Sequence, residues 1–306
     1  MAKIINPFIV TGKIAPEYFC DRVSESARLV KSVTNGNNLV VISPRRMGKT
    51  GLIQFCYDKP EIGKEYYTFF IDILHTSSLR EFTYLLGREI YETLLSRSRK
   101  MATLFIQTIK SISGKFGFDP ISNLPTFNVE LGDIERPEYT LDEIFQYLSH
   151  ADKFCIVAID EFQQICQISG EEYRGFVADS HPKVGEQPFY LCRERTPHDA
   201  GDVCIGRPAV LPQCRHVGAE SHSCGDLHSV YRRAFRAAQP FDSRRRCGKR
   251  FMHFFKGHTY YIQKTFNESF ADTPEGDECT LETIRAAIDN MIASNDTIFP
   301  GDSVER

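Results

Sequence analysis

A glycine, a lysine and a threonine occur in a row at residues 48–50, inside the stretch SPRRMGKT at 43–50. This spacing fits the phosphate-binding pattern G-x-x-x-x-G-K-[ST] at every position but the first, where Ser43 stands instead of glycine. In such a loop, consecutive backbone N–H groups at a helix N-terminus point at phosphate oxygens. Lys49 would neutralise the outer phosphates, and Thr50 would offer its hydroxyl to Mg²⁺. The stretch therefore predicts a loop that holds a nucleoside triphosphate. The residues expected to contact the nucleotide are Ser43, Pro44, Arg45, Arg46, Met47, Gly48, Lys49, Thr50 and Gly51.

A phosphate loop of this kind needs an acid at the end of a neighbouring strand to hold the metal. The stretch FCIVAIDE at 154–161 supplies two carboxylates after an apolar run. Asp160 is the predicted metal ligand, together with Thr50. Glu161 is the predicted base that orients the attacking water, with Lys49 as the second catalytic residue. A strand that simply ends in solvated carboxylates is the plainer alternative.

The elements that must position these residues alternate between strands and helices. Short apolar runs predict buried strands at 37–43, 66–74 and 154–162. Helical spacing predicts helices after the phosphate loop, at 78–95, at 103–112 and at 140–151, where Thr140 and Glu143 suggest a capping box. The turn-rich stretch 114–140 predicts an insertion or a hairpin. This alternation predicts an α/β fold with a parallel sheet between two layers of helices.

Three stretches together resemble one known family. They are YFCDRVSESARLV at 18–30, PRRMGKTGLI at 44–53 and AIDEFQQI at 158–165. In combination they are similar to the archaeal-type ATPase family, within the AAA-like and STAND group of P-loop NTPases. The resemblance implies ATP and Mg²⁺ as ligands and makes Ser43 an ordinary first residue of the loop. It also implies a place near the adenine for Phe19, Arg22 and Glu25. The similarity spans about residues 5–168 and resumes weakly at 252–290.

The block from about 172 to 250 has a different composition. It is rich in arginine and nearly devoid of isoleucine and asparagine, and it shows neither a helical nor a strand period. The family implies a helix and a further strand here, and we expect the sequence as written to form neither. A cysteine-histidine metal module is one reading, but the cysteines lack the close pairs that zinc sites use. We therefore expect an aberrant, poorly packed or disordered segment that leaves the sheet without a central strand.

A shifted reading frame would explain this block. YRGFVADSHPK at 173–183 is compatible with codons that, read one base later, spell IEALLRTHIQK, a peptide with helical spacing. FYLCRE at 189–194 can likewise give FIFAGS, a strand that ends in glycine and serine. The expected domains are a P-loop ATPase core at 1–171, the aberrant segment at 172–250 and a helical remnant of a C-terminal region at 251–306, in a chain that looks truncated at its end.

Bulk properties narrow the functional class. Net charge is −3, so no overall basic field indicates nucleic acid, and the arginine cluster at 232–250 is a weak signal under the frame hypothesis. No apolar run reaches the ~18–20 residues that span a bilayer. The sequence predicts a cytoplasmic ATP-binding protein of this ATPase group with no membrane partner. The resemblance implies Mg²⁺-dependent hydrolysis for the intact family, and we expect hydrolysis to be impaired in this chain. A second copy or another protein are the partners to consider. The alternatives are a non-hydrolysing nucleotide-binding remnant of a disrupted gene and a helper ATPase that acts on DNA.

Overall fold

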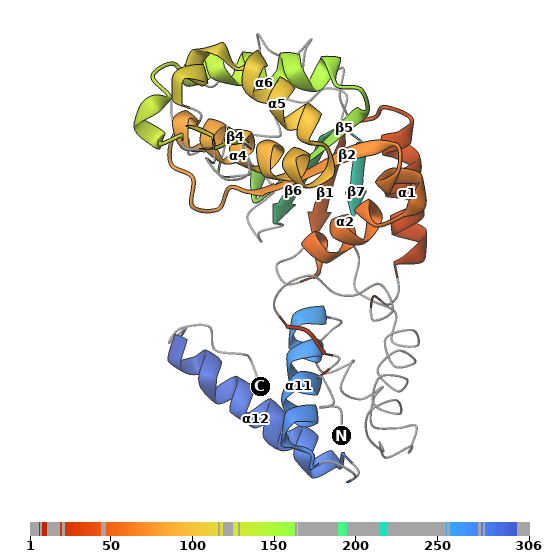
Figure 1. Cartoon of the computed structure of the whole chain (residues 1–306). Helices are drawn as coiled ribbons and strands as arrows, with labels where there is room; N and C mark the ends of the chain where they lie inside the picture. The colour runs from red at the N-terminus through yellow and green to blue at the C-terminus, as the bar shows by residue number, and fades with distance from the viewer. Residues whose placement is uncertain are drawn as a thin grey trace, which may run out of the picture. The chain divides into compact units, whose positions relative to one another are not determined.

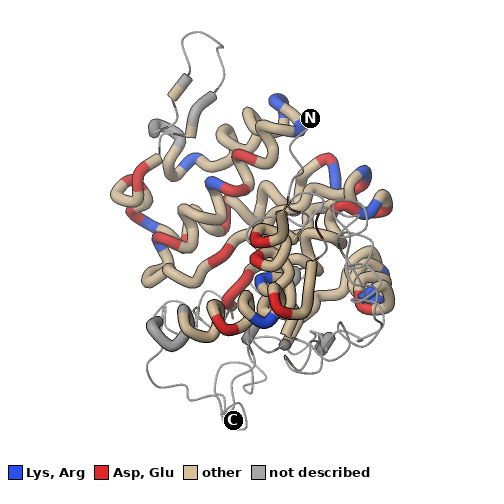
Figure 2. Tube along the Cα trace, turned by 90° about the horizontal axis from the view of Figure 1, so that it is seen from below, with Lys and Arg blue, Asp and Glu red and all other residues tan. Residues whose placement is uncertain are grey.

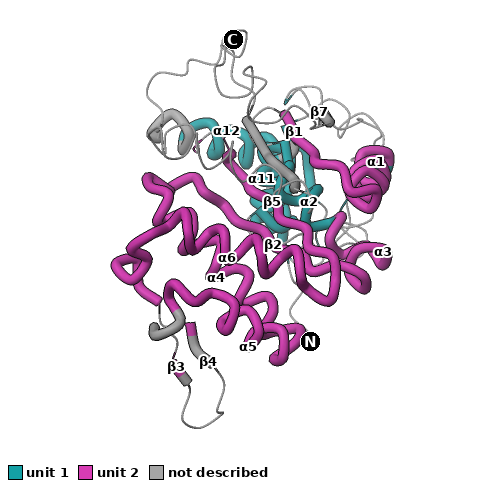
Figure 3. Tube along the Cα trace, turned by 90° about the horizontal axis from the view of Figure 1, so that it is seen from above, with its two compact units in different colours: residues 1–23, 46–55, 220–306 teal, residues 24–45, 56–219 magenta. Residues whose placement is uncertain are grey.

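In a computed structural model, the chain divides into two compact units (Figure 3). Unit 1 comprises residues 1–23, 46–55 and 220–306, and unit 2 comprises residues 24–45 and 56–219. Within them, the structure describes residues 6, 8–10, 19, 22–43, 47–115, 117–118, 125–127, 129–162, 164, 189–194, 215–218, 255, 258–274, 277 and 279–298.

Strands and helices alternate along the described chain, as the sequence predicts. In order they are α1 (Val23–Thr34), β1 (Leu39–Ser43), α2 (Lys49–Tyr57), α3 (Pro60–Gly63), β2 (Tyr66–Asp72), α4 (Leu79–Arg97), α5 (Arg99–Thr108), the 3-10 helix η1 (Lys110–Lys115), β3 (Gly117–Phe118), β4 (Pro125–Thr126), the 3-10 helix η2 (Leu131–Asp133), α6 (Pro137–His150), β5 (Phe154–Asp160), β6 (Phe189–Glu194), β7 (Arg215–Gly218), α11 (Thr259–Asp272) and α12 (Leu281–Ile298).

Unit 2 is built on a five-stranded sheet with the order β2-β5-β6-β1-β7. All four strand pairings in it are parallel. Helices α4, α5 and α6 lie on one side of this sheet, and α1 lies on the other (Figures 1 and 3). The predicted α/β fold, with a parallel sheet between helical layers, is therefore confirmed. The strands read as continuous apolar runs because both faces of the sheet are covered.

The sheet contains the central strand that the sequence analysis expects to be missing, so that expectation is wrong. β6 lies between β5 and β1, with Leu191 paired to both Val40 and Ile159. The apolar run FYLC is only four residues long and is followed by Arg193 and Glu194, so its pattern alone does not indicate a buried strand. Pairing with two neighbouring strands supplies the backbone hydrogen bonds that stabilise it. Apart from β6 and β7, the segment 172–250 lies outside the described residues, including the arginine cluster at 232–250.

The main hydrophobic core joins β2 and β5 to the helices α4, α5 and α6. Helix α4 begins at the N-cap Ser78, whose hydroxyl accepts a hydrogen bond from the Glu81 N–H at 3.2 Å. Its predicted apolar face is buried except at Leu85, which is half-buried; the buried members are Leu79, Phe82, Leu86, Ile90 and Leu94. In α6, Tyr147 packs edge-on against Phe105 of α5, with ring centroids 5.0 Å apart. Packing of these helical faces holds β2 and β5 in place.

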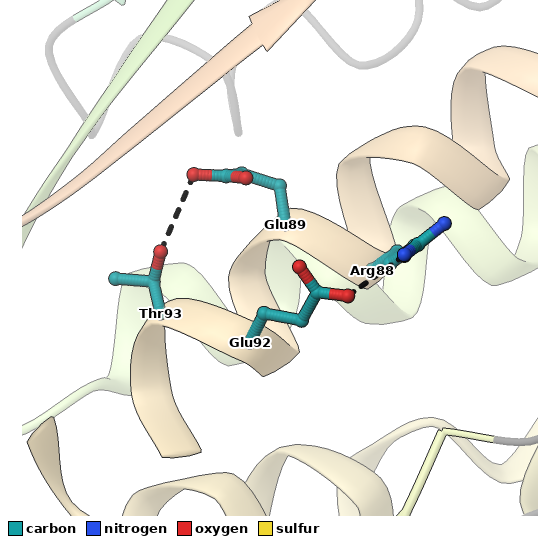
Figure 4. Close-up of polar contacts among 4 residues, drawn as sticks. All are labelled: Arg88, Glu89, Glu92 and Thr93. Carbon is teal, nitrogen blue, oxygen red and sulfur yellow. Dashed lines mark hydrogen bonds and ion pairs between the residues drawn. The ribbon is translucent and has the colours of Figure 1, made fainter. Parts of the chain in front are cut away.

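Side chains of α4 also cover the outer edge of β2, which is an end strand of the sheet. Glu89 accepts a hydrogen bond from the Phe70 N–H at 3.4 Å, and Arg97 donates to the Tyr66 carbonyl at 3.0 Å. The Thr93 hydroxyl donates to Glu89 at 3.3 Å, while Arg88 and Glu92 form an exposed ion pair beside it (Figure 4). Because an open strand edge invites pairing with another chain, these contacts protect the sheet.

Helix α6 begins three residues earlier than predicted, and its predicted capping box is absent. Pro137 occupies the first turn, where its fixed φ favours a helix start. The Thr140 hydroxyl donates back to the Arg136 carbonyl at 3.1 Å. Buried Glu143 instead accepts hydrogen bonds from the N–H and the hydroxyl of Ser111, at 3.0 and 2.6 Å. A tertiary contact to η1 thus takes the acid that the sequence pattern assigns to a cap.

The turn-rich stretch between α5 and α6 contains an antiparallel pair, β3–β4, which confirms the predicted hairpin among the described residues there. Phe127, directly after β4, packs against Tyr84 and Tyr91 of α4 at centroid distances of 5.9 and 5.6 Å. The hairpin is thereby attached to the helical layer.

The C-terminal part of unit 1 consists of α11 and α12. Helix α11 buries Ile262, Phe266 and Phe270, which are spaced four residues apart and so lie on one face of the helix. Phe8 stacks on Phe266 with centroids 5.6 Å apart. The Asn6 side chain donates to the Asn267 carbonyl at 2.9 Å, so residues from the start of the chain pack against α11.

Basic and acidic residues are interspersed along the part of the chain that the structure describes, as Figure 2 shows. Among the described helices, none combines the length and the apolar character that a membrane crossing requires.

Candidate phosphate-binding site

One group of candidate residues lies at the start of α2 in unit 1. Gly48 has φ +76°, a conformation that side-chain-bearing residues rarely adopt, and its carbonyl accepts the Leu52 N–H at 3.0 Å. Lys49 is the first helical residue and is only 6% exposed. In a helix that begins here, the first N–H groups point out along the helix axis, where an anion can accept them. Glycine, lysine and helix start thus occur together as the sequence predicts.

The other predicted loop residues fall on either side of a gap. Ser43 is the last residue of β1, and Met47 is 4% exposed. Thr50 and Gly51 lie in the first turn of α2. Pro44, Arg45 and Arg46 lie outside the described residues. On one side of this gap an apolar strand ends, and on the other a helix begins with the lysine as its first residue.

Another group of candidate residues lies at the carboxyl end of β5 in unit 2. Asp160 ends the strand and is 6% exposed, and one of its carboxylate oxygens accepts the Glu161 N–H at 3.0 Å. Glu161 has φ +56°. A left-handed backbone ends the strand here, two residues before its predicted end. Non-glycine residues in this conformation are uncommon and cluster at functional sites.

Gln164 links the turn after β5 to the turn after β2. Its N–H donates to the Glu161 carbonyl at 2.9 Å, and its side-chain amide donates to the Leu74 carbonyl at 2.8 Å. In the turn after β2, Asp72 accepts the Leu74 N–H at 2.9 Å. These hydrogen bonds stabilise the backbone at Glu161 and the end of β5.

The strand order places the carboxyl ends of β1 and β5 at one edge of the sheet, with β6 between them. From β1 the chain leads to β2 at one end of the sheet, whereas from β6 it leads past β1 to β7 at the other end. The connections thus reverse direction between β1 and β6. Ligands of open α/β sheets bind outside the carboxyl ends of the strands at such a switch point. Ser43, which leads into the phosphate loop, ends β1 at this point.

The donor types present fit a magnesium-bound triphosphate. Mg²⁺ is held in proteins by one or two carboxylates together with substrate phosphates and water, so it needs no dense cage of side chains. Among the described residues, no three His, Cys, Asp or Glu side chains gather to hold a metal. Buried Asp160 in unit 2 carries a carboxylate, and Thr50 in unit 1 carries a hydroxyl. Each is a donor type that suits Mg²⁺ in a P-loop protein.

The sequence analysis does not identify two residues that lie near the carboxyl ends of the strands, Asp72 and Gln164. Asp72 ends β2 beside Asp160, and the same signal identifies it, namely a carboxylate at the end of an apolar run. Gln164 follows the two acids and carries no signal by itself, because its role depends on a turn that comes from a different part of the chain.

No protein-family model matches the chain, and neither does any curated protein sequence. Solved structures do match its fold. The Orc1 protein of Aeropyrum pernix, solved in complex with DNA, has a TM-score of 0.56 and 10% identity, over 96% of this chain and 70% of that one. A Walker-type ATPase of Pyrococcus abyssi has a TM-score of 0.61 and 16% identity, over 95% of this chain and 79% of that one.

A third structure, the Orc2 protein of Aeropyrum pernix, contains ADPNP and ADP. It has a TM-score of 0.55 and 14% identity and covers 88% of this chain and 68% of that one. All three identities are low, so the comparisons bear on the fold. The parallel sheet, its helical layers and these neighbours agree: the chain shares the α/β fold of these three structures.

Proposed function

We propose that the chain binds ATP together with Mg²⁺ and hydrolyses it, as an ATPase of the archaeal-type, STAND-like group. The observation that carries the proposal is Lys49, a buried lysine at the first position of α2, directly after a glycine with positive φ. A helix start favours negative charge, and its first N–H groups can donate to an anion. A triphosphate is an anion that suits a lysine at this place.

In the proposed reaction Lys49 and the first N–H groups of α2 bind the phosphates, with the residues from Ser43 to Gly51 as the loop. Thr50 and Asp160 would hold Mg²⁺, which offsets negative charge on the phosphates. Glu161 would orient a water molecule in line with the outer phosphate and accept its proton. The turn held by Gln164 keeps the Glu161 backbone in place for this role.

Support for the finer assignment comes from the three stretches that resemble the archaeal-type family. Two of the three structural neighbours also agree with a nucleotide ligand: one is described as a Walker-type ATPase, and the other contains ADPNP and ADP. One neighbour was solved with DNA, which makes duplex DNA a reasonable addition to an activity assay.

The test is ATP binding by titration calorimetry with and without Mg²⁺, followed by phosphate release under the same conditions. Lys49→Ala should lower the affinity for Mg²⁺–ATP by about 100-fold or more, because a charged group that contacts the ligand is lost. Arg28→Ala is the matched control, since Arg28 is an exposed cation on α1 and its removal changes the net charge equally. Equal affinity in all three proteins would overturn the proposal.

Phosphate release separates the candidate functions. If the natural chain releases phosphate, and Glu161→Gln releases it about 100-fold or more slowly while it retains ATP affinity, the chain is a hydrolase with Glu161 as base. Tight binding with no release identifies the non-hydrolysing remnant. Release that rises on addition of duplex DNA favours the helper ATPase.

A further inference from the structure

The segment before α1 reaches the phosphate loop through a buried arginine. Arg22 is 2% exposed, and its guanidinium donates a hydrogen bond to the Met47 carbonyl. Its backbone is left-handed, with φ +56°. All these atoms belong to unit 1, as does the start of α2. A buried charged donor thus binds the peptide group directly before the glycine of the loop.

A second contact joins the same segment to α2. The ring of Phe19, three residues before Arg22, stacks on Phe55 with centroids 4.1 Å apart and planes 12° from parallel. Phe55 lies almost two turns into α2, whereas Met47 precedes its first turn. Phe19 therefore contacts α2, and Arg22 contacts the residue before the loop glycine, so two side chains near the start of α1 reach this region.

The bond to Met47 determines the direction of another group. A trans peptide is planar, so its C=O and N–H point in opposite directions. The structure contains no cis peptide bond among its described residues. Holding the Met47 carbonyl toward Arg22 consequently turns the Gly48 N–H to the opposite side. Gly48 permits this orientation because glycine adopts a positive φ without steric cost.

We propose that Arg22 is a positioning residue of the phosphate loop, which orients the Met47–Gly48 peptide so that the Gly48 N–H donates to phosphate. The inference rests on the proposed function, and it assigns Arg22 a role directed at the phosphates and independent of the base. An unheld peptide at this position can rotate, so that its carbonyl oxygen faces the anion. Arg22 opposes that rotation before the ligand arrives, which lowers the cost of ordering on binding.

This role differs from the one that the sequence resemblance implies, a place near the adenine. A residue that contacts the base affects only ligands that have a base. A residue that orients the loop affects every ligand with a phosphate chain, including one without base and sugar. Inorganic tripolyphosphate is therefore the probe that separates the two roles.

The variants are Arg22→Gly and Arg22→Lys, with Arg28→Ala as the control of equal charge change. Glycine tolerates the positive φ of position 22, so Arg22→Gly removes the guanidinium without adding backbone strain. Arg22→Lys keeps a charged donor and tests rescue if the glycine variant does not fold. Thermal unfolding checks the fold of each variant, and calorimetry in Mg²⁺ measures the affinities for ATP, AMP and tripolyphosphate.

We expect Arg22→Gly to bind ATP and tripolyphosphate about 10- to 100-fold more weakly, by similar factors, because one hydrogen bond from a charged group is lost. The lysine variant should fall between it and the natural chain. The affinity ratio of ATP to AMP should also shrink, which serves as the readout if tripolyphosphate binds too weakly to measure. Guanidinium ion at millimolar concentration should restore part of the affinity of Arg22→Gly, which a general loss of structure would not allow.

Two results would overturn the inference while leaving ATP binding intact. One is a folded Arg22 variant that binds ATP and AMP more weakly by the same factor but binds tripolyphosphate as tightly as the natural chain does. This result would assign Arg22 to the base. The other is a folded variant with unchanged affinity for all three ligands. Failure of the natural chain to bind ATP and tripolyphosphate at all would instead overturn the proposed function.

Discussion

Asp72 and Asp160 are paired in register at the carboxyl ends of β2 and β5, yet only Asp160 is buried. Each accepts a backbone hydrogen bond from its own turn, Asp72 from Leu74 at 2.9 Å and Asp160 from Glu161 at 3.0 Å. The two acids therefore share their chemistry and their strand position. They differ in burial and in distance along the sheet from β1, which makes them a matched pair for experiments.

The pair predicts different effects of the same substitution. Asp160→Asn should weaken Mg²⁺-dependent ATP binding by about 10- to 100-fold, because the amide is a poor ligand for a hard cation. Asp72→Asn should leave the Mg²⁺ dependence unchanged, since its exposed carboxylate lies one strand further from β1. Titration of ATP affinity against Mg²⁺ concentration measures both. Equal losses in the two variants would place the metal between β2 and β5.

The left-handed backbone of Glu161 predicts a separation of stability from activity. A residue with a side chain costs roughly 1–2 kcal/mol in this conformation, and glycine does not carry that cost. Glu161→Gly should therefore be about 1 kcal/mol more stable than Glu161→Ala, although both lack the base and should release no phosphate. Chemical denaturation gives the stabilities. If the alanine variant equals or exceeds the glycine variant, the backbone of residue 161 is not left-handed in solution.

Burial raises the pKa of Glu89 above its ordinary value of 4.5, while hydrogen bonds from the Phe70 N–H and the Thr93 hydroxyl oppose the increase. Because the folded chain holds this proton more tightly than the unfolded chain, the contribution to stability is largest below the ordinary pKa. It is lost as the pH rises through the folded pKa. Glu89→Gln should remove this dependence and raise the melting temperature at pH 7 relative to the natural chain.

Thermal unfolding from pH 4 to pH 8 measures the effect, and the gap between Glu89→Gln and the natural chain should widen as the pH rises. Glu92→Gln is the control on the same helix, because its ion pair with Arg88 is exposed and contributes about 0.5 kcal/mol or less. Parallel pH profiles for Glu89→Gln and the natural chain would contradict the prediction.

Two buried thiols should be inert in the folded protein. Burial raises the pKa of Cys56 and of Cys155 to about 12 each, so the reactive thiolate is scarce at pH 8. Brief exposure to iodoacetamide, followed by peptide mass spectrometry, should leave both residues unmodified until denaturant is added. Modification of Cys155 without denaturant would mean that β5 opens locally, because this residue lies inside the strand.

Local sequence patterns are sufficient to predict the helices and strands that depend mainly on their own residues. The apolar runs of β1, β2 and β5, the face of α4 and the glycine-lysine-threonine helix start need only a short window, and all are found near their predicted positions. Element ends were predicted less well, because Pro137 and the turn at Glu161 set boundaries that periodicity does not detect.

The remaining features depend on contacts between distant parts of the chain. β6 has only a short apolar run, and its place in the sheet depends on pairing with β5 and β1. Glu143 bonds to Ser111 instead of capping its own helix, since the fold brings η1 alongside α6. The bond from Arg22 to Met47 likewise joins two stretches that the sequence analysis assigned to different ligand groups. Spacing within one stretch cannot indicate any of these.

Both strands that border β1 come from the later half of the chain, which has a consequence for biosynthesis. When Leu39–Ser43 leaves the ribosome, neither β6 nor β7 has been translated. At about 5–20 residues per second, roughly 7–30 s pass before the first of these partners exists. During that interval the nascent segment has apolar side chains and unpaired amides, which is the state that chaperones recognise. Ribosome pausing between β5 and β6 would therefore lengthen the exposure of the very strand that leads into the phosphate loop.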